Sequence, residues 1–369
     1  MSSLYPMLIR PRYVERIWGG HDLADRLGKD IPRDKPIGES WEIYEENTVE
    51  NGAYAGRTIG ELRGAMGRDL TGHVSPDELF PLLTKLIDAN QTLSVQVHPD
   101  DGFARTIEHQ PYGKTECWYV IYAAPDATLT YGFNRDSGPD EYAALVAEGK
   151  LDGLLRPLPV KEGDVVYIPA GMVHAIGAGI IVYELQQTSD TTYRIYDWNR
   201  RDASGKAREL HVDKASQVLD YHRITAGIVR TVTAPGSGRT MLIAGHYFCE
   251  ELVEAGAAGS LSTHESAVAV CALDRPLRVS AGDSTDLVDL APYCSLLIPA
   301  AAGTYTLHPV EADGAPARAL VSYVPVSDDA TRDDLHGRGF SPREVDDFMA
   351  QFAPAADLGQ DARHEAISH

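Results

Sequence analysis

Alternating apolar and polar residues predict strands over much of the middle of the chain. Between residues 92 and 99, Leu93, Val95 and Val97 alternate with polar positions, which is the period of a half-buried strand. Gln96 and His98 lie two residues apart in this strand, so their side chains point to the same face. Further strands are predicted by the segments ECWYVIYA, TLTYGF, GDVVYIP, IIVYELQQ and TTYRIYDW. The fold class is therefore mainly β.

Two stretches have the three- and four-residue apolar spacing of helices. The first contains IGELRGAM and ELFPLLTKLIDA, and the second is PDEYAALVAEGKLDGLLRPL. We predict helical excursions near residues 58–90 and 139–158, both within a first unit spanning residues 1–233.

A second β-rich stretch covers residues 234–326 and loosely repeats the order of the first. It has a strand pair, a Gly-Asp turn, and an IPA strand followed by a turn and a histidine, His308. No Gln-x-His or Lys-x-Glu segment precedes His308, so this unit is predicted to be structural and without a metal site. Residues 327–369 form an acidic C-terminal extension. One helix is predicted there, with Ser341 as N-cap and Glu344 three residues later, before a flexible end.

The charge balance limits the partners of the chain. Its 33 Lys and Arg against 54 Asp and Glu give a formal net charge of -21, which argues against nucleic acid and against an anionic membrane surface. An anionic ligand would need basic side chains gathered locally at its site. The four cysteines show no CxxC spacing and indicate free thiols in a reducing compartment. With no signal-like or membrane-spanning apolar run, a cytoplasmic location is expected.

Three segments together indicate a metal centre. Gln96 and His98 share a strand face, Glu116 follows Lys114 at a spacing of two, and His174 follows a Pro-Ala-Gly turn. A lone strand histidine is more often a core residue than a ligand, and a Lys-x-Glu pair is more often a surface ion pair. The occurrence of HPDD, KTE and GDVxxIPxGxxH in this order favours a metal site over those structural interpretations. A Gly-Asp turn and a strand ending in Pro-x-Gly-x-x-His are how a cupin barrel presents its last ligand.

These segments resemble the type I phosphomannose isomerase family, in its short bacterial form. The similarity runs through IWGG, IGESWE, LSVQVHPDD, GKTECWYV, GDVVYIPAGMVHAIG and SDTTYRIYDWNR, which covers about the first 200 residues densely. It implies two cupin-type (jelly-roll) β-barrels and one zinc ion per chain, held by Gln96, His98, Glu116 and His174. The donor set alone would also suit Fe(II), Ni(II) or Mn(II), and the resemblance favours zinc.

The resemblance also implies an activity, the interconversion of mannose 6-phosphate and fructose 6-phosphate. This reaction moves a proton between C2 and C1 through an enediol, so it needs an electrophile, a general base and a phosphate clamp. Arg194 and Lys114 match family residues that supply positive charge. Glu184 and Asp190 match acidic family residues, and either could be the base. Asp190 could equally organise the turn after its strand.

Other residues have two interpretations. Trp18 could stack on a sugar, but a core position is favoured. Glu39 and Glu42 are expected to hold the ligands or the lysine from outside the first coordination sphere. Arg200 and Arg201 could reach a phosphate, but a solvated loop is favoured.

The chain departs from the family pattern at a few places. Asn199 replaces an acidic residue, the extension beyond Val326 is long, and only the excursion around 139–158 stands where long members have a large helical insertion. That difference suggests an open pocket and a broad substrate range. Competing hypotheses are an isomerase for another aldose or sugar phosphate and a non-catalytic metal-binding sugar module. An iron cupin dioxygenase fits poorly, because it would carry more histidines. A homo-oligomer stays open.

Overall fold

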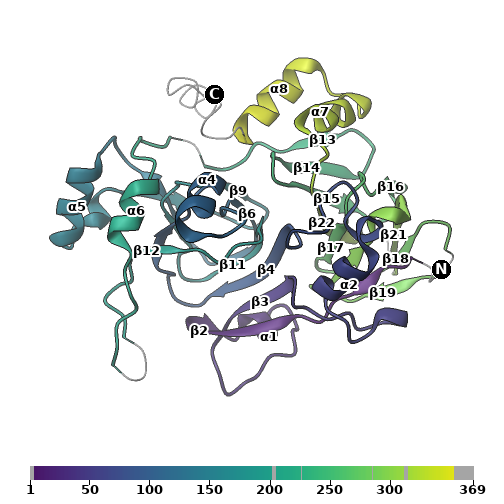
Figure 1. Ribbon diagram of the computed structural model, residues 1–369, viewed down its shortest axis with the longest axis horizontal. Coiled ribbons are helices and arrows are strands. Elements are labelled where there is room, and N and C mark those ends of the chain that lie inside the picture. Colours follow the sequence, from purple (N-terminus) through teal and green to yellow (C-terminus); the bar gives the residue numbers. More distant parts are fainter. Residues whose placement is uncertain (1–3, 202–204, 226, 285, 311–314, 353–369) are drawn as a thin grey trace.

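Four antiparallel sheets form two neighbouring β-barrels in a computed structural model of the chain (Figure 1). The structure describes residues 4–352, except 202–204, 226, 285 and 311–314. The first barrel has a six-stranded sheet in the order β2-β3-β4-β11-β6-β9 and a five-stranded sheet in the order β12-β5-β10-β7-β8. Their bounds are β2 Arg12–Gly20, β3 Ile37–Ile43, β4 Leu82–Ala89, β5 Val95–Val97, β6 Glu116–Ala123, β7 Thr128–Phe133, β8 Leu155–Pro159, β9 Val165–Ile168, β10 His174–Ala175, β11 Ile180–Gln187 and β12 Tyr193–Tyr196.

The second barrel has a seven-stranded sheet in the order β1-β20-β17-β22-β15-β14-β13 and a four-stranded sheet in the order β16-β21-β18-β19. Their bounds are β1 Met7–Leu8, β13 Val232–Ala234, β14 Arg239–Ala244, β15 Cys249–Glu254, β16 Ser260–Ser262, β17 Val268–Ala272, β18 Leu277–Ala281, β19 Val288–Leu290, β20 Ser295–Ile298, β21 Thr304–Pro309 and β22 Arg318–Tyr323. Strand β1 pairs with β20, so the start of the chain joins the sheet of the second barrel. The mainly β, two-barrel fold class is confirmed, and the boundaries at residues 233 and 326 stay predictions.

Short helices cover the outside of the barrels. Their bounds are α1 Asp22–Asp25, α2 Ile59–Met66, α3 Arg68–Thr71, α4 Asp101–Phe103, α5 Pro139–Ala147, α6 Val212–Val218, α7 Asp328–Gly337 and α8 Pro342–Met349, with a π-helix η2 at Ala104–Glu108. Tyr142 of α5 and Ala215 of α6 belong to the same buried cluster as Val95 and Val97 of β5, so these two helices cover the outer face of the five-stranded sheet (Figure 1, left). Among the described residues, no helix is both long and apolar enough to cross a membrane. All four cysteines carry free thiols, as predicted.

Both predicted helical excursions are only partly helical. The prediction for 58–90 is wrong for Leu82–Ala89, which forms β4 between β3 and β11. All eight residues of β4 are buried, and a run covered on both faces cannot be told from a buried helix by its period. The prediction for 139–158 is wrong beyond Ala147: Gly149 has a left-handed φ of 66°, typical of a helix C-terminus, and Leu155–Pro159 is strand β8.

The C-terminal extension begins with two helices. The predicted helix is confirmed as α8, with Ser341 and Glu344 forming a reciprocal capping box. The preceding α7 was not predicted, although the Ser327 side chain caps it by accepting a hydrogen bond from the backbone N–H of Ala330. The flexible end predicted after α8 falls on residues 353–369, outside the described residues.

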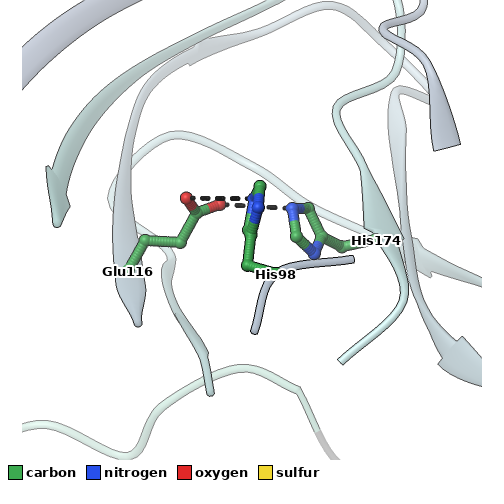
Figure 2. A group of neighbouring side chains, drawn as sticks. All are labelled: His98, Glu116 and His174. Carbon is green, nitrogen blue, oxygen red and sulfur yellow. Dashed lines mark ion pairs between the residues drawn. The ribbon is translucent and has the colours of Figure 1, made fainter. Parts of the chain in front are cut away.

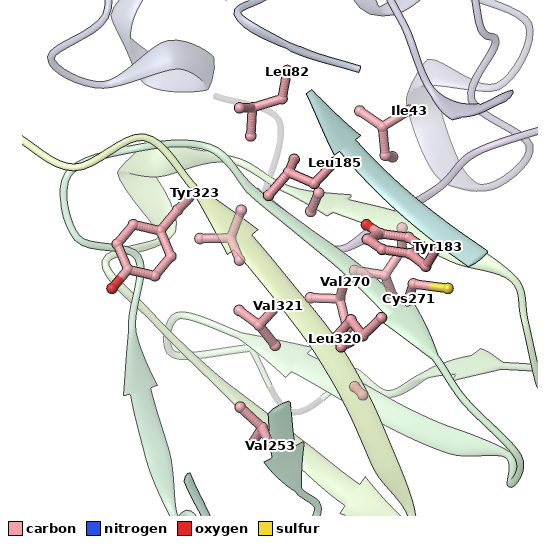
Figure 3. Packing of buried hydrophobic residues seen from close by; sticks show 14 of the residues in the cluster. Ile43, Leu82, Tyr183, Leu185, Val253, Val270, Cys271, Leu320, Val321 and Tyr323 are labelled. Carbon is pink, nitrogen blue, oxygen red and sulfur yellow. The ribbon is translucent and has the colours of Figure 1, made fainter. Parts of the chain in front are cut away.

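Strands β6 and β11 contribute side chains to two hydrophobic clusters, one inside the first barrel and one between the two barrels. Successive side chains in a strand point to opposite faces. Trp118 and Val182 point into the first barrel and pack with Leu129 of the facing sheet. Tyr183 and its alternating neighbours point the other way, onto the second barrel, where one continuous core joins both sheets. Figure 3 shows this layer, with Leu82, Tyr183 and Leu185 beside Val270, Cys271, Leu320 and Val321.

Candidate active site

Neighbouring strands bring the predicted ligands together inside the first barrel. His174 on β10 is paired with Gln96 on β5, His98 follows the end of β5, and Glu116 is the first residue of β6. One nitrogen of each histidine and one oxygen of Glu116 lie within 4.8 Å of one another. Figure 2 shows the two rings and the carboxylate facing one another. The cluster is buried, with His98, Glu116 and His174 each at most 1% exposed.

Hydrogen bonds to backbone carbonyls orient both imidazole rings. His98 Nδ1 donates to the Thr191 carbonyl at 2.9 Å, and His174 Nδ1 donates to the Met172 carbonyl at 2.8 Å. With Nδ1 protonated, each Nε2 keeps its lone pair. These Nε2 atoms face Glu116, at 3.6 Å for His98 and 3.3 Å for His174. This is the arrangement in which outer hydrogen bonds fix metal-binding imidazoles.

Glu116 is an ionised carboxylate, and only one of its two oxygens has a hydrogen-bond partner among the described residues. Burial, the largest single influence, would raise its pKa, but Lys114 and the two histidines together outweigh burial and hold the pKa well below its usual value. Oxygen Oε1 is buried and has no hydrogen-bond partner among the described residues. Bonds of about 2.0–2.1 Å to a tetrahedral zinc ion would separate two ligand atoms by about 3.3 Å, close to the Glu116–His174 spacing. The residues present therefore fit a divalent cation.

Gln96 and Lys114 complete the centre. The Gln96 amide Nε2 donates to His174 Nε2 at 3.2 Å. Lys114 Nζ donates to His98 Nε2 at 3.2 Å and forms a short ion pair with Glu116 Oε2. The Lys114 side chain is only 5% exposed. Burial lowers the pKa of His98 well below its usual value, and the positive charge of Lys114 is the second cause of this shift. The His98 ring therefore stays neutral.

A buried ion pair between Glu184 and Lys85 extends the site along the six-stranded sheet. Lys85 Nζ donates to Glu184 Oε2 at 2.8 Å and to Gln186 Oε1 at 2.7 Å. Trp118 Nε1 donates to Glu184 Oε1 at 3.0 Å, and the Trp118 ring meets the His174 ring edge-on at 5.5 Å. Lys85 and Gln186 were not predicted from the sequence. A lysine inside the apolar run LLTKLIDA was the available signal.

Arg194 lies on the strand beside Gln96, whereas the Asp190 side chain is exposed. Arg194 on β12 is paired with Gln96, and its guanidinium donates to Ser94 Oγ at 3.3 Å and to the Glu209 carbonyl at 3.0 Å. Asp190 is exposed, and no described residue forms a hydrogen bond with its side chain. Of the four residues predicted for catalysis, Lys114 contacts the ligands directly and Glu184 reaches the His174 ring through Trp118. Arg194, on the facing sheet, is paired with Gln96.

The secondary predictions had mixed outcomes. Trp18 is a core residue, 3% exposed, as favoured. The prediction for Glu39 is wrong, because its carboxylate accepts hydrogen bonds from Arg16 and Trp41 rather than from a ligand or Lys114. The charges of Lys85 and Arg16 outweigh burial and keep the pKa of Glu39 below its usual value. The prediction for Glu42 is wrong, because its partners are Lys29 and Ser40 rather than the ligands or Lys114.

The predictions for Arg200 and Arg201, in the loop after β12, had different outcomes. Arg201 is exposed, in line with a solvated loop, but Arg200 is not. The Arg200 side chain is 15% exposed and forms an ion pair with Asp197 at 2.7 Å. The prediction of a solvated loop is therefore wrong for Arg200.

Comparisons with known proteins agree with this site. The profile described as phosphomannose isomerase type I, catalytic domain, matches residues 7–119. The chain is 47% identical over 223 residues to the mannose-6-phosphate isomerase ManA of Bacillus subtilis, covering 59% of this chain and 69% of the relative. It is 42% identical over 248 residues to the mannose-6-phosphate isomerase of Streptococcus mutans, covering 66% and 77%. The crystal structure of a Bacillus subtilis mannose 6-phosphate isomerase superposes with a TM-score of 0.75 at 33% identity, covering 86% of this chain and 99% of that one.

Proposed function

The chain belongs to the type I phosphomannose isomerase family, and from this premise we propose that it interconverts D-mannose 6-phosphate and D-fructose 6-phosphate with one bound zinc ion. The observation that carries the proposal is the buried set of two imidazoles aimed at a carboxylate, one oxygen of which has no hydrogen-bond partner among the described residues. Relatives that are 42–47% identical bear the name mannose-6-phosphate isomerase. The proposed partner is thus a small sugar phosphate, and free thiols support a cytoplasmic location.

The proposed zinc ligands are Gln96, His98, Glu116 and His174. A set of two imidazoles, one carboxylate and one amide oxygen suits Zn²⁺, and a 180° turn of the Gln96 amide would present its oxygen where its nitrogen now faces His174. A bound zinc ion would supply a Lewis acid without redox activity, which polarises a sugar oxygen. The buried position of the cluster excludes bulk water and strengthens such electrostatic interactions.

The residues around the ligands divide the remaining tasks. We assign to Lys114 and Arg194 the stabilisation of negative charge on the enediolate oxygens, because Lys114 contacts His98 and Arg194 is paired with Gln96. We assign proton transfer between C1 and C2 to Glu184 in preference to Asp190. Glu184 is buried and reaches the His174 ring through Trp118, whereas Asp190 is exposed and is proposed to organise the turn after β11.

Metal analysis together with activity tests this function. Purified protein is expected to hold about one zinc ion per chain, to interconvert the two hexose phosphates, and to lose activity on chelation. His98→Ala and Glu116→Ala should lose both metal and activity, because each removes a ligand. His308→Ala is the matched control, since His308 lies in the second barrel and contacts Ser280. Activity retained by His98→Ala and Glu116→Ala together would refute the assignment.

A further inference from the structure

A second charged cluster lies where strand β12 ends. Asp197 is buried, with its side chain 6% exposed. Its carboxylate accepts hydrogen bonds from Arg208 Nε at 2.7 Å and Arg208 Nη2 at 2.5 Å, and from Arg200 Nη2 at 2.7 Å. The charge of Arg208 and Arg200 outweighs burial and keeps the pKa of Asp197 below its usual value. Two guanidinium groups share one carboxylate, so this cluster keeps a surplus positive charge.

The two guanidinium groups still have donors to offer. Arg208 binds Asp197 through Nε and Nη2, and Arg200 does so through the same two nitrogens. The Nη1 groups of both arginines have no hydrogen-bond partner among the described residues. The side chains are 25% and 15% exposed, so a ligand from solvent can reach them. Guanidinium groups with fixed planes and free N–H groups are suited to bind phosphate oxygens in pairs.

The cluster adjoins the proposed active site through Arg194. Arg194 is paired with Gln96, and it donates to the carbonyl of Glu209, the residue after Arg208. Asp197 follows three residues after Arg194, at most roughly 10 Å further along the chain. Arg16, bound to Glu39 at 2.7 Å, approaches from the neighbouring sheet. Burial lowers the pKa of Arg194, and the charges of Arg208, Arg16 and Arg200 lower it further, so three other cations lie within electrostatic range of Arg194.

This concentration of positive charge is notable in a chain of net charge -21. In the proposed reaction the carbons that react are C1 and C2, and the phosphate sits at the far end of the sugar. We propose that Arg200 and Arg208 bind the phosphomonoester end of the substrate, and that Asp197 is a positioning residue that fixes their guanidinium planes. The inference rests on the proposed function for its substrate, but the anion site itself does not depend on catalysis.

Variants of the cluster separate binding from chemistry. Arg208→Gln should raise the KM for mannose 6-phosphate by about tenfold or more, because it removes a charged hydrogen-bond donor, while kcat and zinc content change little. Arg208→Lys should recover part of the loss, since it restores the charge without the planar fork. Asp197→Asn should also raise KM, because the guanidinium groups lose their common anchor. Arg201→Gln is the matched control: Arg201 belongs to the same loop but donates to the Gly205 carbonyl.

Binding of inorganic phosphate, measured by titration calorimetry at low ionic strength, gives a second readout that needs no turnover. We expect wild-type protein and Arg201→Gln to bind it alike, and Arg208→Gln and Asp197→Asn to bind it about tenfold more weakly or worse. If Arg208→Gln binds phosphate as tightly as wild type and keeps its KM, the proposal is overturned. If phosphate binding is lost as expected but wild-type protein isomerises neither sugar phosphate, the anion site stands and the proposed function fails.

Discussion

Buried carboxylates in this protein behave in opposite ways, and the difference comes from single neighbours. Glu116 faces Lys114 and two imidazoles and stays ionised. Glu250 on β15 is just as buried, in the layer between the two barrels, but its only hydrogen-bond partner among the described residues is the Cys117 thiol, 3.5 Å from Oε2. Burial therefore raises the pKa of Glu250 from 4.5 to about 8. The Tyr183 hydroxyl is also buried and has no hydrogen-bond partner among the described residues; it lies in the same layer.

This raised pKa predicts that Glu250 makes folding pH-dependent. The folded state keeps the proton up to about pH 8, whereas the unfolded chain releases it near pH 4.5. The contribution is therefore full below pH 4.5 and is lost as pH rises to 8, by an amount on the order of 5 kcal/mol. Urea unfolding near pH 5, 7 and 9 should show a difference between wild type and Glu250→Gln that shifts in favour of the variant with rising pH. Parallel profiles would contradict this, and Glu254→Gln at the exposed end of β15 is the control.

At the scale of elements, helix α7 is fastened to the second barrel by one buried ionic contact. Arg338, at the C-terminus of α7, donates to both oxygens of Glu251 at 2.9 Å. Arg239 of β14 binds the same carboxylate. Burial, the largest single influence, would raise the pKa of Glu251, but Arg338 and Arg239 together outweigh burial and lower this pKa to about 2. The extension after β22 is therefore held by a charge pair whose arginine side chain is 8% exposed and whose glutamate is 1% exposed.

Replacing Arg338 should test that fastening. Arg338→Met keeps much of the apolar stem but leaves Glu251 with one cation, and removing one partner of a buried pair typically costs about 3 kcal/mol or more. We expect a loss of that size in the free energy of unfolding, measured by urea titration. Arg343→Met on α8 should change little, because its contact with Asp347 is at the surface. Equal effects of the two substitutions would show that the buried contact is not what holds the helix.

Elements also show what the sequence could and could not predict. Gln96 and His98 were placed correctly because a spacing of two fixes a shared strand face whatever the rest of the fold does. Strand β4 was mistaken for a helix because cover on both faces removes the alternation. Lys85 and Asp197 were missed for another reason: their roles depend on Glu184 and on Arg208, partners that only strand pairing and loop closure bring near. Local periodicity does not contain that information.

On the scale of the whole molecule, the two barrels share a core. Leu185 and Tyr183 of β11 belong to the same continuous hydrophobic cluster as Val270, Cys271 and Leu320 of the second barrel (Figure 3). Strand β1 adds a further tie, since it crosses from the start of the chain to pair with β20. A unit that loses its neighbour would expose this apolar layer to water, so we expect the barrels to unfold together.

Tryptophan fluorescence makes this expectation measurable. All four tryptophans (Trp18, Trp41, Trp118 and Trp198) lie in the first barrel or the loop after β12, so their emission reports that barrel, whereas far-UV circular dichroism reports both. The two transitions should coincide in urea. Leu185→Ala, at a fully buried position, should move both to lower urea together, with a loss of about 2–5 kcal/mol. A fluorescence transition that separates from the dichroism transition would mean that the barrels are independent.

Strands β6 and β11 contribute side chains both to the proposed active site and to the core shared by the two barrels, and this limits which mutations they tolerate. Glu116 and Trp118 face the metal centre, and Cys117 and Tyr119, between and beyond them, face the other barrel. Deleting or inserting one residue in either strand would turn each side chain after that point to the opposite face of the sheet. Carboxylates would then face the hydrophobic layer between the barrels, and apolar side chains would face the metal centre. The fold can tolerate single substitutions in these strands, but it cannot tolerate a one-residue insertion or deletion there. Length variation among natural variants should therefore fall in the loops and spare these two strands.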